Sequence, residues 1–339
     1  LTHSFHLLPN TPNWEMLKGI FLKSVELIPS VGESPNRQQN RSAESDFGEF
    51  IKNSTYATSS FVNEPDTDWA LPFNRTWAKE IRAKWMFDKD QSLKIPLVIN
   101  GKEILNAATR DILDVNTGVK IGEYTLANTI DIDNAIEAAE RETEWKSLTF
   151  KQRHEILSKV AQELRKMRAD LIGIAAAEVG KLFTETDVEV SEAIDFAEYY
   201  PWSMEAFTER KNLQVDPKGI GLIIPPWNFP IAIPAGGILA SLAAGNNTII
   251  KPAPQSVYCA YMLCRAFWKA GVPSSALQFL PTNNDPEGTY LISHPKIDFT
   301  IFTGSTKTGL FILERQQDST LFAETGGKNA TIVTAAADR

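Results

Sequence analysis

Short apolar runs alternate with segments of helical periodicity from about residue 219 to the end of the chain, and this alternation constrains the fold more than any other feature. Such an alternation is typical of βαβ units, in which parallel strands form one sheet and the intervening helices pack on its faces. We predict strands over residues 219–224, 247–251, 277–280, 299–303 and 321–324, and helices over residues 231–244, 256–270, 286–293 and 306–315. The sequence therefore predicts an α/β fold with a parallel sheet and flanking helices.

The chain before residue 219 has mainly helical periodicity. Helices are predicted over residues 131–139, with Asp131 as the N-cap, and over residues 150–167, 169–179 and 184–207. Asn100 and Gly101 follow an extended apolar segment and predict the turn of a hairpin.

The first 60 residues differ in composition from the rest of the chain. Residues 1–27 carry the apolar pattern of a short amphipathic helix, whereas residues 28–60 are rich in Ser, Asn and Gln and indicate a linker. We therefore divide the chain into an N-terminal extension with its linker, residues 1–60, and a folded domain, residues 61–339.

The composition excludes several classes of protein. A net charge of −8 argues against nucleic acid as a partner, because phosphate binding requires clustered Lys and Arg. The two cysteines and four histidines show no zinc-ligand spacing, predict no disulfide framework and suit a reducing, cytoplasmic compartment. No uninterrupted apolar run is long enough for a membrane span. We expect a cytoplasmic protein that acts on a small molecule.

Polar motifs follow the predicted strands where each strand ends. In parallel sheets, ligands bind beyond the carboxyl ends of the strands. This rule directs attention to four loops, at residues 225–229, 251–255, 303–305 and 324–327.

The first of these loops places Asn228 among prolines, which fix the backbone and remove amide donors. The side-chain amide of Asn228 could stabilise an oxyanion on a carbonyl adduct. Alternatively, it bonds its own backbone in an ordinary turn.

The loop at residues 303–305 leads into a predicted helix. Gly304 allows a ligand to approach the backbone, and the helix N-terminus at Ser305 suits a pyrophosphate. The alternative is that Ser305 or Thr306 only caps the helix.

Lys251 and Glu324 each end a predicted buried strand. Lys251 could reach a ribose hydroxyl or a phosphate, or it is an ordinary charge facing solvent. Glu324 could be a general base whose pKa is raised by burial, or a surface residue of a loop. Cys259 and Cys264 fall on different faces of the predicted helix 256–270, and we interpret both as packing residues.

The order of these motifs resembles the aldehyde dehydrogenase superfamily. The resemblance runs from about residue 97 to the end of the chain. It rests on four ordered segments: Pro226-Trp227-Asn228-Phe229-Pro230, Lys251-Pro252-Ala253, Phe302-Thr303-Gly304-Ser305-Thr306 and Glu324-Thr325-Gly326-Gly327-Lys328. The resemblance implies the Rossmann-like NAD-binding domain of that family and the NAD(P)-dependent oxidation of an aldehyde to a carboxylic acid.

The resemblance also implies roles for single residues. Asn228 corresponds to the oxyanion-stabilising Asn, and Glu324 to the general base that activates the hydrolytic water. Lys251 corresponds to the Lys that contacts the adenosine ribose, and Gly304 and Ser305 to the pyrophosphate-binding pair. The remaining cofactor contacts are implied at Ile224, Pro226, Trp227, Gly288, Phe302 and Gly326.

A narrower resemblance concerns the substrate. Residues 323–330 are similar to the corresponding segment of L-glutamate γ-semialdehyde (1-pyrroline-5-carboxylate) dehydrogenases, enzymes of proline catabolism. Residues 62–69 resemble the segment before that module in bifunctional proline utilization proteins. Residues 6–13 look like the end of the proline dehydrogenase barrel of those proteins.

The sequence departs from the family pattern in three places. Pro254 stands where many relatives have a ribose-binding Glu, so NADP is not excluded as the cofactor. Residues 282–284 replace common glycines. Neither Cys259 nor Cys264 matches the nucleophilic cysteine, so we expect a chain that ends before the catalytic domain and does not turn over by itself.

Two other interpretations stay open at this point. The intact protein could be an aldehyde dehydrogenase with a different substrate, or the chain could be a non-catalytic module that resembles a dehydrogenase. The resemblance also implies a homo-oligomer, with residues 208–220 as a candidate arm of the associating hairpin.

Overall fold

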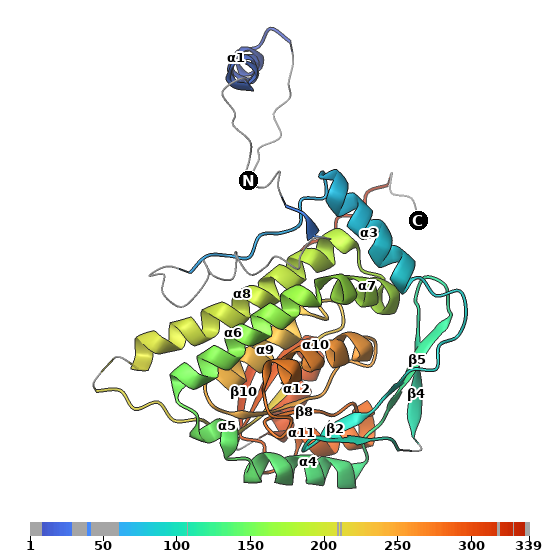
Figure 1. Ribbon diagram of the computed structural model, residues 1–339, viewed down its shortest axis with the longest axis vertical. Coiled ribbons are helices and arrows are strands. Elements are labelled where there is room, and N and C mark those ends of the chain that lie inside the picture. Colours follow the sequence, from blue (N-terminus) through green and yellow to red (C-terminus); the bar gives the residue numbers. More distant parts are fainter. Residues whose placement is uncertain are drawn as a thin grey trace.

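The computed structural model describes residues 9–28, 39–41, 61–106, 108–208, 210, 212–316, 319–327 and 329–335. Its centre is a seven-stranded sheet in the order β10-β9-β6-β7-β8-β2-β3, with helices on both faces (Figure 1). Five of these strands are parallel: β6 (Ile220–Ile224), β7 (Asn247–Ile250), β8 (Leu277–Phe279), β9 (Phe299–Gly304) and β10 (Thr320–Thr325). The predicted α/β fold with a parallel sheet is confirmed.

A hairpin extends the parallel sheet at one edge. It consists of β2 (Leu97–Ile99) and β3 (Lys102–Ile104), and β2 pairs antiparallel to β8. The predicted turn is present, because Asn100 and Gly101 have φ angles of 47° and 76°, as a tight hairpin turn requires. A separate three-stranded sheet contains β1 (Lys94–Ile95), β4 (Thr109–Leu113) and β5 (Lys120–Thr125).

Helices pack against both faces of the sheet. One core joins it to α6 (Phe150–Lys166), α7 (Arg168–Val179), α8 (Phe183–Thr208), α9 (Ala232–Ala243) and α10 (Val257–Ala270). A second core joins the opposite face to α4 (Thr129–Arg141), α11 (Thr289–Ile292) and α12 (Thr306–Arg315). Leu222 belongs to the second core and Ile223 to the first, as expected when successive side chains of a strand point to opposite faces.

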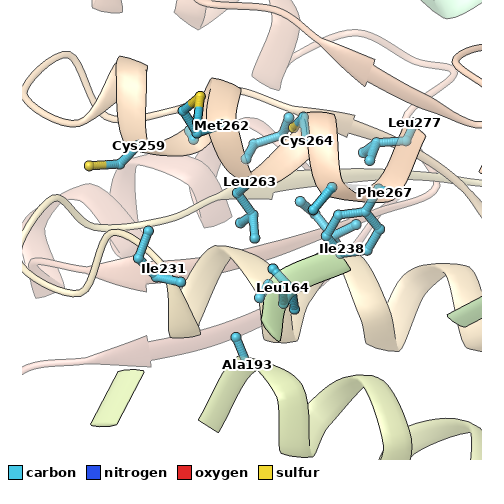
Figure 2. Packing of buried hydrophobic residues seen from close by; sticks show 14 of the residues in the cluster. Leu164, Ala193, Ile231, Ile238, Cys259, Met262, Leu263, Cys264, Phe267 and Leu277 are labelled. Carbon is cyan, nitrogen blue, oxygen red and sulfur yellow. The ribbon is translucent and has the colours of Figure 1, made fainter. Parts of the chain in front are cut away.

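The cysteines belong to the first core. Cys259 and Cys264 are both 0% exposed. Figure 2 shows them on one helix, with Leu263 and Phe267 beside them. The interpretation of both as packing residues is confirmed.

The remaining described helices are α1 (Pro12–Leu27), α3 (Pro72–Trp85), α5 (Glu144–Ser147) and a π-helical turn over Asn284–Gly288. The helix predicted in residues 1–27 is therefore present as α1, which has no buried residue and lies apart from the sheet in Figure 1. The sequence did not predict α3. Within the described ranges, no helix has the length and apolarity needed to cross a membrane.

Three local predictions need correction. Asp131 is the third residue of α4, and Asn128 is the N-cap; the two side chains form a reciprocal capping box. The helix predicted over 286–293 begins with the π-helical turn. The predicted strand at 321–324 is not buried, because β10 is the sheet edge and pairs only with β9 among the described strands.

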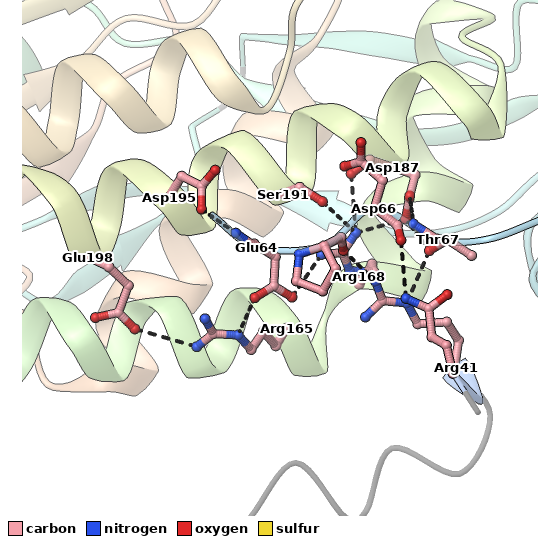
Figure 3. Close-up of polar contacts among 12 residues, drawn as sticks. Arg41, Glu64, Asp66, Thr67, Arg165, Arg168, Asp187, Ser191, Asp195 and Glu198 are labelled. Atoms are coloured by element: carbon pink, nitrogen blue, oxygen red, sulfur yellow. Dashed lines mark hydrogen bonds and ion pairs between the residues drawn. The ribbon is translucent and has the colours of Figure 1, made fainter. Parts of the chain in front are cut away.

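Buried ion pairs attach residues 61–69 to the helices. The carboxylate of Glu64 is 2.9 Å from Arg165 Nε and 3.1 Å from Arg168 Nη2, and Arg168 Nη1 is 2.8 Å from Asp187 Oδ1. Asp187 also accepts a hydrogen bond of 2.6 Å from the backbone N–H of Thr67. Figure 3 shows this set, which we call the arginine network (Glu64, Arg165, Arg168 and Asp187). Most of the predicted linker, residues 28–60, lies outside the described residues.

Candidate functional site

The strand order reverses at β6. The chain passes from β6 through β7 to β8 on one side, then returns to place β9 on the other side of β6. Neighbouring loops diverge at such a switch point and leave a crevice beyond the strand ends, which is where ligands bind in open α/β sheets.

A cleft of about 930 Å³ occupies this position, and we call it the switch-point cleft. Three strand-end loops contribute most of its lining. The lining residues include Pro225, Pro226, Trp227, Asn228, Phe229, Phe302, Thr303, Gly304, Ser305, Glu324, Thr325 and Gly326.

The loop after β6 carries the most exposed aromatic side chains of the cleft. We call residues 225–230 the asparagine loop. Trp227 and Phe229 are 50% and 42% exposed although they follow a buried strand. Asn228 lies between them and lines the cleft. An apolar rim around an amide is suited to a ligand with a flat ring and a polar group.

The loop after β9 provides a helix N-terminus. Ser305 is the N-cap of α12, and its Oγ accepts a hydrogen bond of 3.1 Å from the N–H of Thr308. A Cβ atom at Gly304 would lie 2.7 Å from Cζ of Phe302, so the Phe302 ring would have to move if residue 304 carried a side chain. The capping interpretation of Ser305 is correct, because its Oγ accepts the hydrogen bond from Thr308. Ser305 also lines the cleft.

The end of β10 and the residue after it place Glu324 and Gly326 in the cleft. Glu324 is exposed. Of the two interpretations of Glu324, the buried carboxylate is therefore wrong and the surface residue is correct, because β10 is the edge strand among the described strands. An exposed carboxylate on the cleft lining is open to solvent water.

Lys251, Gly288 and Ile224 do not line the switch-point cleft. Lys251 is buried at the end of β7, and its Nζ is 3.2 Å from Oδ1 of Asn284. Burial lowers the pKa of Lys251 to about 8. A Cβ atom at Gly288 would lie 3.0 Å from Cε of Lys251, so these two residues are neighbours beyond the β7 end of the sheet.

A second cavity of about 540 Å³ lies on the other side of the asparagine loop. Both cavities are lined by Trp227, Asn228 and Phe229, so the loop forms a wall between them. The second cavity also contains four charged side chains that the sequence analysis did not single out: Lys181, Glu185, Glu189 and Glu192.

Burial raises the pKa of two carboxylates that line the second cavity. Burial raises the pKa of Glu189, although the Lys181 ammonium opposes this effect. Burial, together with the neighbouring charges of Glu189 and Asp195, raises the pKa of Glu192. Neither cavity includes a cysteine. Within the described residues, no group of three or more His, Cys, Asp or Glu side chains could hold a metal ion.

The fold and the position of the cleft define a doubly wound α/β protein with a ligand site at its switch point. The model of the aldehyde dehydrogenase family matches residues 105–339. The chain therefore belongs to the aldehyde dehydrogenase family.

Known relatives share most of this chain but extend beyond it. The chain is 37% identical over 294 residues to the 1-pyrroline-5-carboxylate dehydrogenase of Staphylococcus saprophyticus, covering 81% of this chain and 57% of that protein. Proline utilization A from Bdellovibrio bacteriovorus has a TM-score of 0.75 at 30% identity, covering 81% of this chain and 30% of that one. The Thermus 1-pyrroline-5-carboxylate dehydrogenase with bound NAD has a TM-score of 0.74 at 30% identity, covering 80% of this chain and 56% of that one.

Proposed function

We propose that this chain is the nucleotide-binding part of an NAD(P)-dependent dehydrogenase that oxidises L-glutamate γ-semialdehyde to L-glutamate. The observation that carries the proposal is the switch-point cleft, which is lined by polar residues from the ends of β6, β9 and β10. This cleft lies in a chain that belongs to the aldehyde dehydrogenase family. The substrate follows from the names of the similar proteins, which are 1-pyrroline-5-carboxylate dehydrogenases.

The cleft fits a dinucleotide. The N-terminus of α12 with Gly304 and Ser305 suits a pyrophosphate, because a helix N-terminus attracts anions and Gly304 leaves the backbone accessible. Pro226, Trp227 and Phe302 supply apolar walls, and Gly326 also lines the cleft. We propose Ile224, Lys251 and Gly288 as contacts for the adenosine end. When bound, NAD(P) accepts the hydride.

Two residues of the cleft suit aldehyde chemistry. The Asn228 amide can donate to an oxygen that becomes negative when a nucleophile adds to the carbonyl. The exposed Glu324 carboxylate can take a proton from water that attacks an acyl intermediate.

The proposed reaction also needs a nucleophilic thiol at the cleft. Cys259 and Cys264 cannot supply it, because both are 0% exposed in α10. We therefore expect the 339-residue chain to bind the cofactor and to show no turnover. The chain spans about 57% of the length of the similar staphylococcal enzyme. The division into an extension, residues 1–60, and a nucleotide-binding domain, residues 61–339, is part of the proposal.

Titration calorimetry of the 339-residue chain with NAD and with NADP tests the cofactor site. We expect saturable binding of at least one of them, and a folded sample that binds neither at millimolar concentration would refute the site.

An aldehyde panel assayed on a longer protein that contains this chain tests the substrate. Turnover of simple alkyl aldehydes without turnover of glutamate semialdehyde would favour a different aldehyde dehydrogenase. Cofactor binding with no turnover of any aldehyde would favour a non-catalytic module.

A further inference from the structure

Lys181 is placed by the junction between α7 and α8. Gly180 ends α7 in the left-handed conformation with φ of 71°, and the N–H of Lys181 bonds back to the carbonyl of Ala175 at 3.2 Å. This turn directs the Lys181 side chain toward the asparagine loop, and α8 begins two residues later at Phe183.

The ammonium group of Lys181 contacts the asparagine loop directly. Its Nζ donates a hydrogen bond of 2.9 Å to the backbone carbonyl of Asn228. It also lies 3.8 Å from the centre of the Phe229 ring, a cation–π contact. The carbonyl and ring belong to the wall between the two cavities, so this amine contacts the loop at its exposed part.

Glu189 contacts the other end of the same loop. One carboxylate oxygen of Glu189 pairs with Lys181. The other oxygen accepts hydrogen bonds of 3.0 and 3.1 Å from the N–H groups of Ile231 and Ala232, where α9 begins. The loop itself has prolines at 225, 226 and 230, which have no N–H to donate. The Lys181–Glu189 ion pair therefore holds both ends of the asparagine loop, which has few backbone N–H donors of its own.

The pair is enclosed, which makes it more than a surface salt bridge. The side chains of Lys181 and Glu189 are 10% and 1% exposed. Exposed pairs are weak and replaceable, whereas losing one member of an enclosed pair leaves a charge without compensation. From this geometry we infer that Lys181 and Glu189 are positioning residues, which together hold the asparagine loop and present Asn228 to the cleft. The effect of this pair on catalysis through Asn228 rests on the proposed function. Its role in fixing the asparagine loop does not.

Hydrogen exchange of the unliganded 339-residue chain tests the inference without any cofactor. In Lys181→Met, the backbone amides between residues 227 and 232, Pro230 excepted because it has none, should exchange about tenfold faster, the loss expected for one hydrogen bond to a charged group. Lys181→Arg should restore the protection, because a guanidinium can reach the same carboxylate and carbonyl. Lys166→Met is the matched control, since Lys166 pairs with Glu163 on the exposed side of α6. Unchanged protection of residues 227–232 in Lys181→Met would overturn the inference.

Lys181→Met could unfold the chain by leaving Glu189 charged and unpaired. The double variant Lys181→Met, Glu189→Leu removes both charges and avoids that problem. It should fold and still show exchange at Ile231 and Ala232 that is about tenfold faster, because their shared acceptor is gone. Wild-type protection there would overturn the inference.

Titration with NADH separates a positioning role from a purely structural one. We expect the dissociation constant to rise about tenfold in Lys181→Met and to return in Lys181→Arg, because Trp227 lines the cofactor cleft. A lower melting temperature with unchanged affinity would show that the pair only stabilises the fold. If the wild-type chain does not bind NADH, the proposed function fails, and the exchange experiment still decides the role of the pair.

Discussion

The arginine network and the switch-point cleft use polar side chains in opposite ways. In the network, Arg168 and Asp187 are 0% and 1% exposed and each charge has a partner. In the cleft, Ser305 is exposed directly after β9, and Glu324 is exposed near the end of β10. Paired and buried charges fix one segment against another, whereas open polar groups around an apolar rim are available to a ligand. The contrast predicts that mutations in the first region change stability and that mutations in the second change binding.

The largest effect on stability is expected when Arg168 of the arginine network is replaced. Arg168→Met leaves Glu64 and Asp187 without one of their partners inside the protein, and we expect a loss of about 3–5 kcal/mol in the free energy of unfolding. Urea unfolding followed by circular dichroism measures it. Lys296→Met is the matched control, because Lys296 and Glu140 are 45% and 52% exposed, and it should cost at most about 1 kcal/mol. Equal losses in the two variants would contradict a structural role for the network.

The pH dependence of stability gives a second test, at Glu178. Its carboxylate accepts hydrogen bonds of 2.7 Å from the N–H groups of Tyr258 and Cys259, at the start of α10. Burial raises the pKa of Glu178 from 4.5 to about 7, although these bonds oppose the shift. The native chain thus holds a proton that the unfolded chain has lost, so this contribution favours folding at low pH. It is lost as the pH rises from 4.5 to about 7.

Over that pH range we expect the wild type to lose about 3 kcal/mol more stability than Glu178→Gln, which has no such proton to release. Urea unfolding of both proteins at a series of pH values measures the difference. Parallel pH profiles would refute the assignment to Glu178.

A smaller effect should separate the two roles of Ser305. Ser305→Ala removes the N-cap of α12 and should cost about 1 kcal/mol of stability, and it should also weaken NADH binding several-fold. Thr149→Ala is the control, because Thr149 caps α6 away from the cleft. It should cost a similar stability and leave the affinity for NADH unchanged. Equal affinities in the two variants would remove Ser305 from the cofactor site.

The smallest effect is expected at the thiols. Burial raises the pKa of both Cys259 and Cys264, so neither should react with a disulfide reagent at pH 8 while the chain is folded. Both should react after unfolding in urea. Rapid reaction of the native chain would show that one thiol reaches solvent and would reopen the question of the nucleophile.

The sequence predicted the elements that depend on local pattern. The strands and helices after residue 219 were recognisable because their apolar runs and turns are contiguous. The sequence left the burial or exposure of Glu324 open, because the answer depends on β10 lying at the edge of the sheet, and strand order is not a local property. Lys181 and Glu189 were missed because their partner loop lies more than 35 residues further along the chain. Arg165 and Arg168 were missed because charged residues on a helix resemble a solvent-facing surface until a distant segment covers them.

Because Trp227, Asn228 and Phe229 line both cavities, ligands of the two cavities are thermodynamically linked whenever one of them displaces these residues. A molecule that moves these residues from one side alters the shape of the site on the other side. Linkage is reciprocal: the factor by which the first molecule changes the affinity for the second ligand equals the factor by which the second ligand changes the affinity for the first molecule. A compound that fills the space beside Lys181 and shifts this wall would therefore be detected through the apparent affinity for NADH, without touching the dinucleotide.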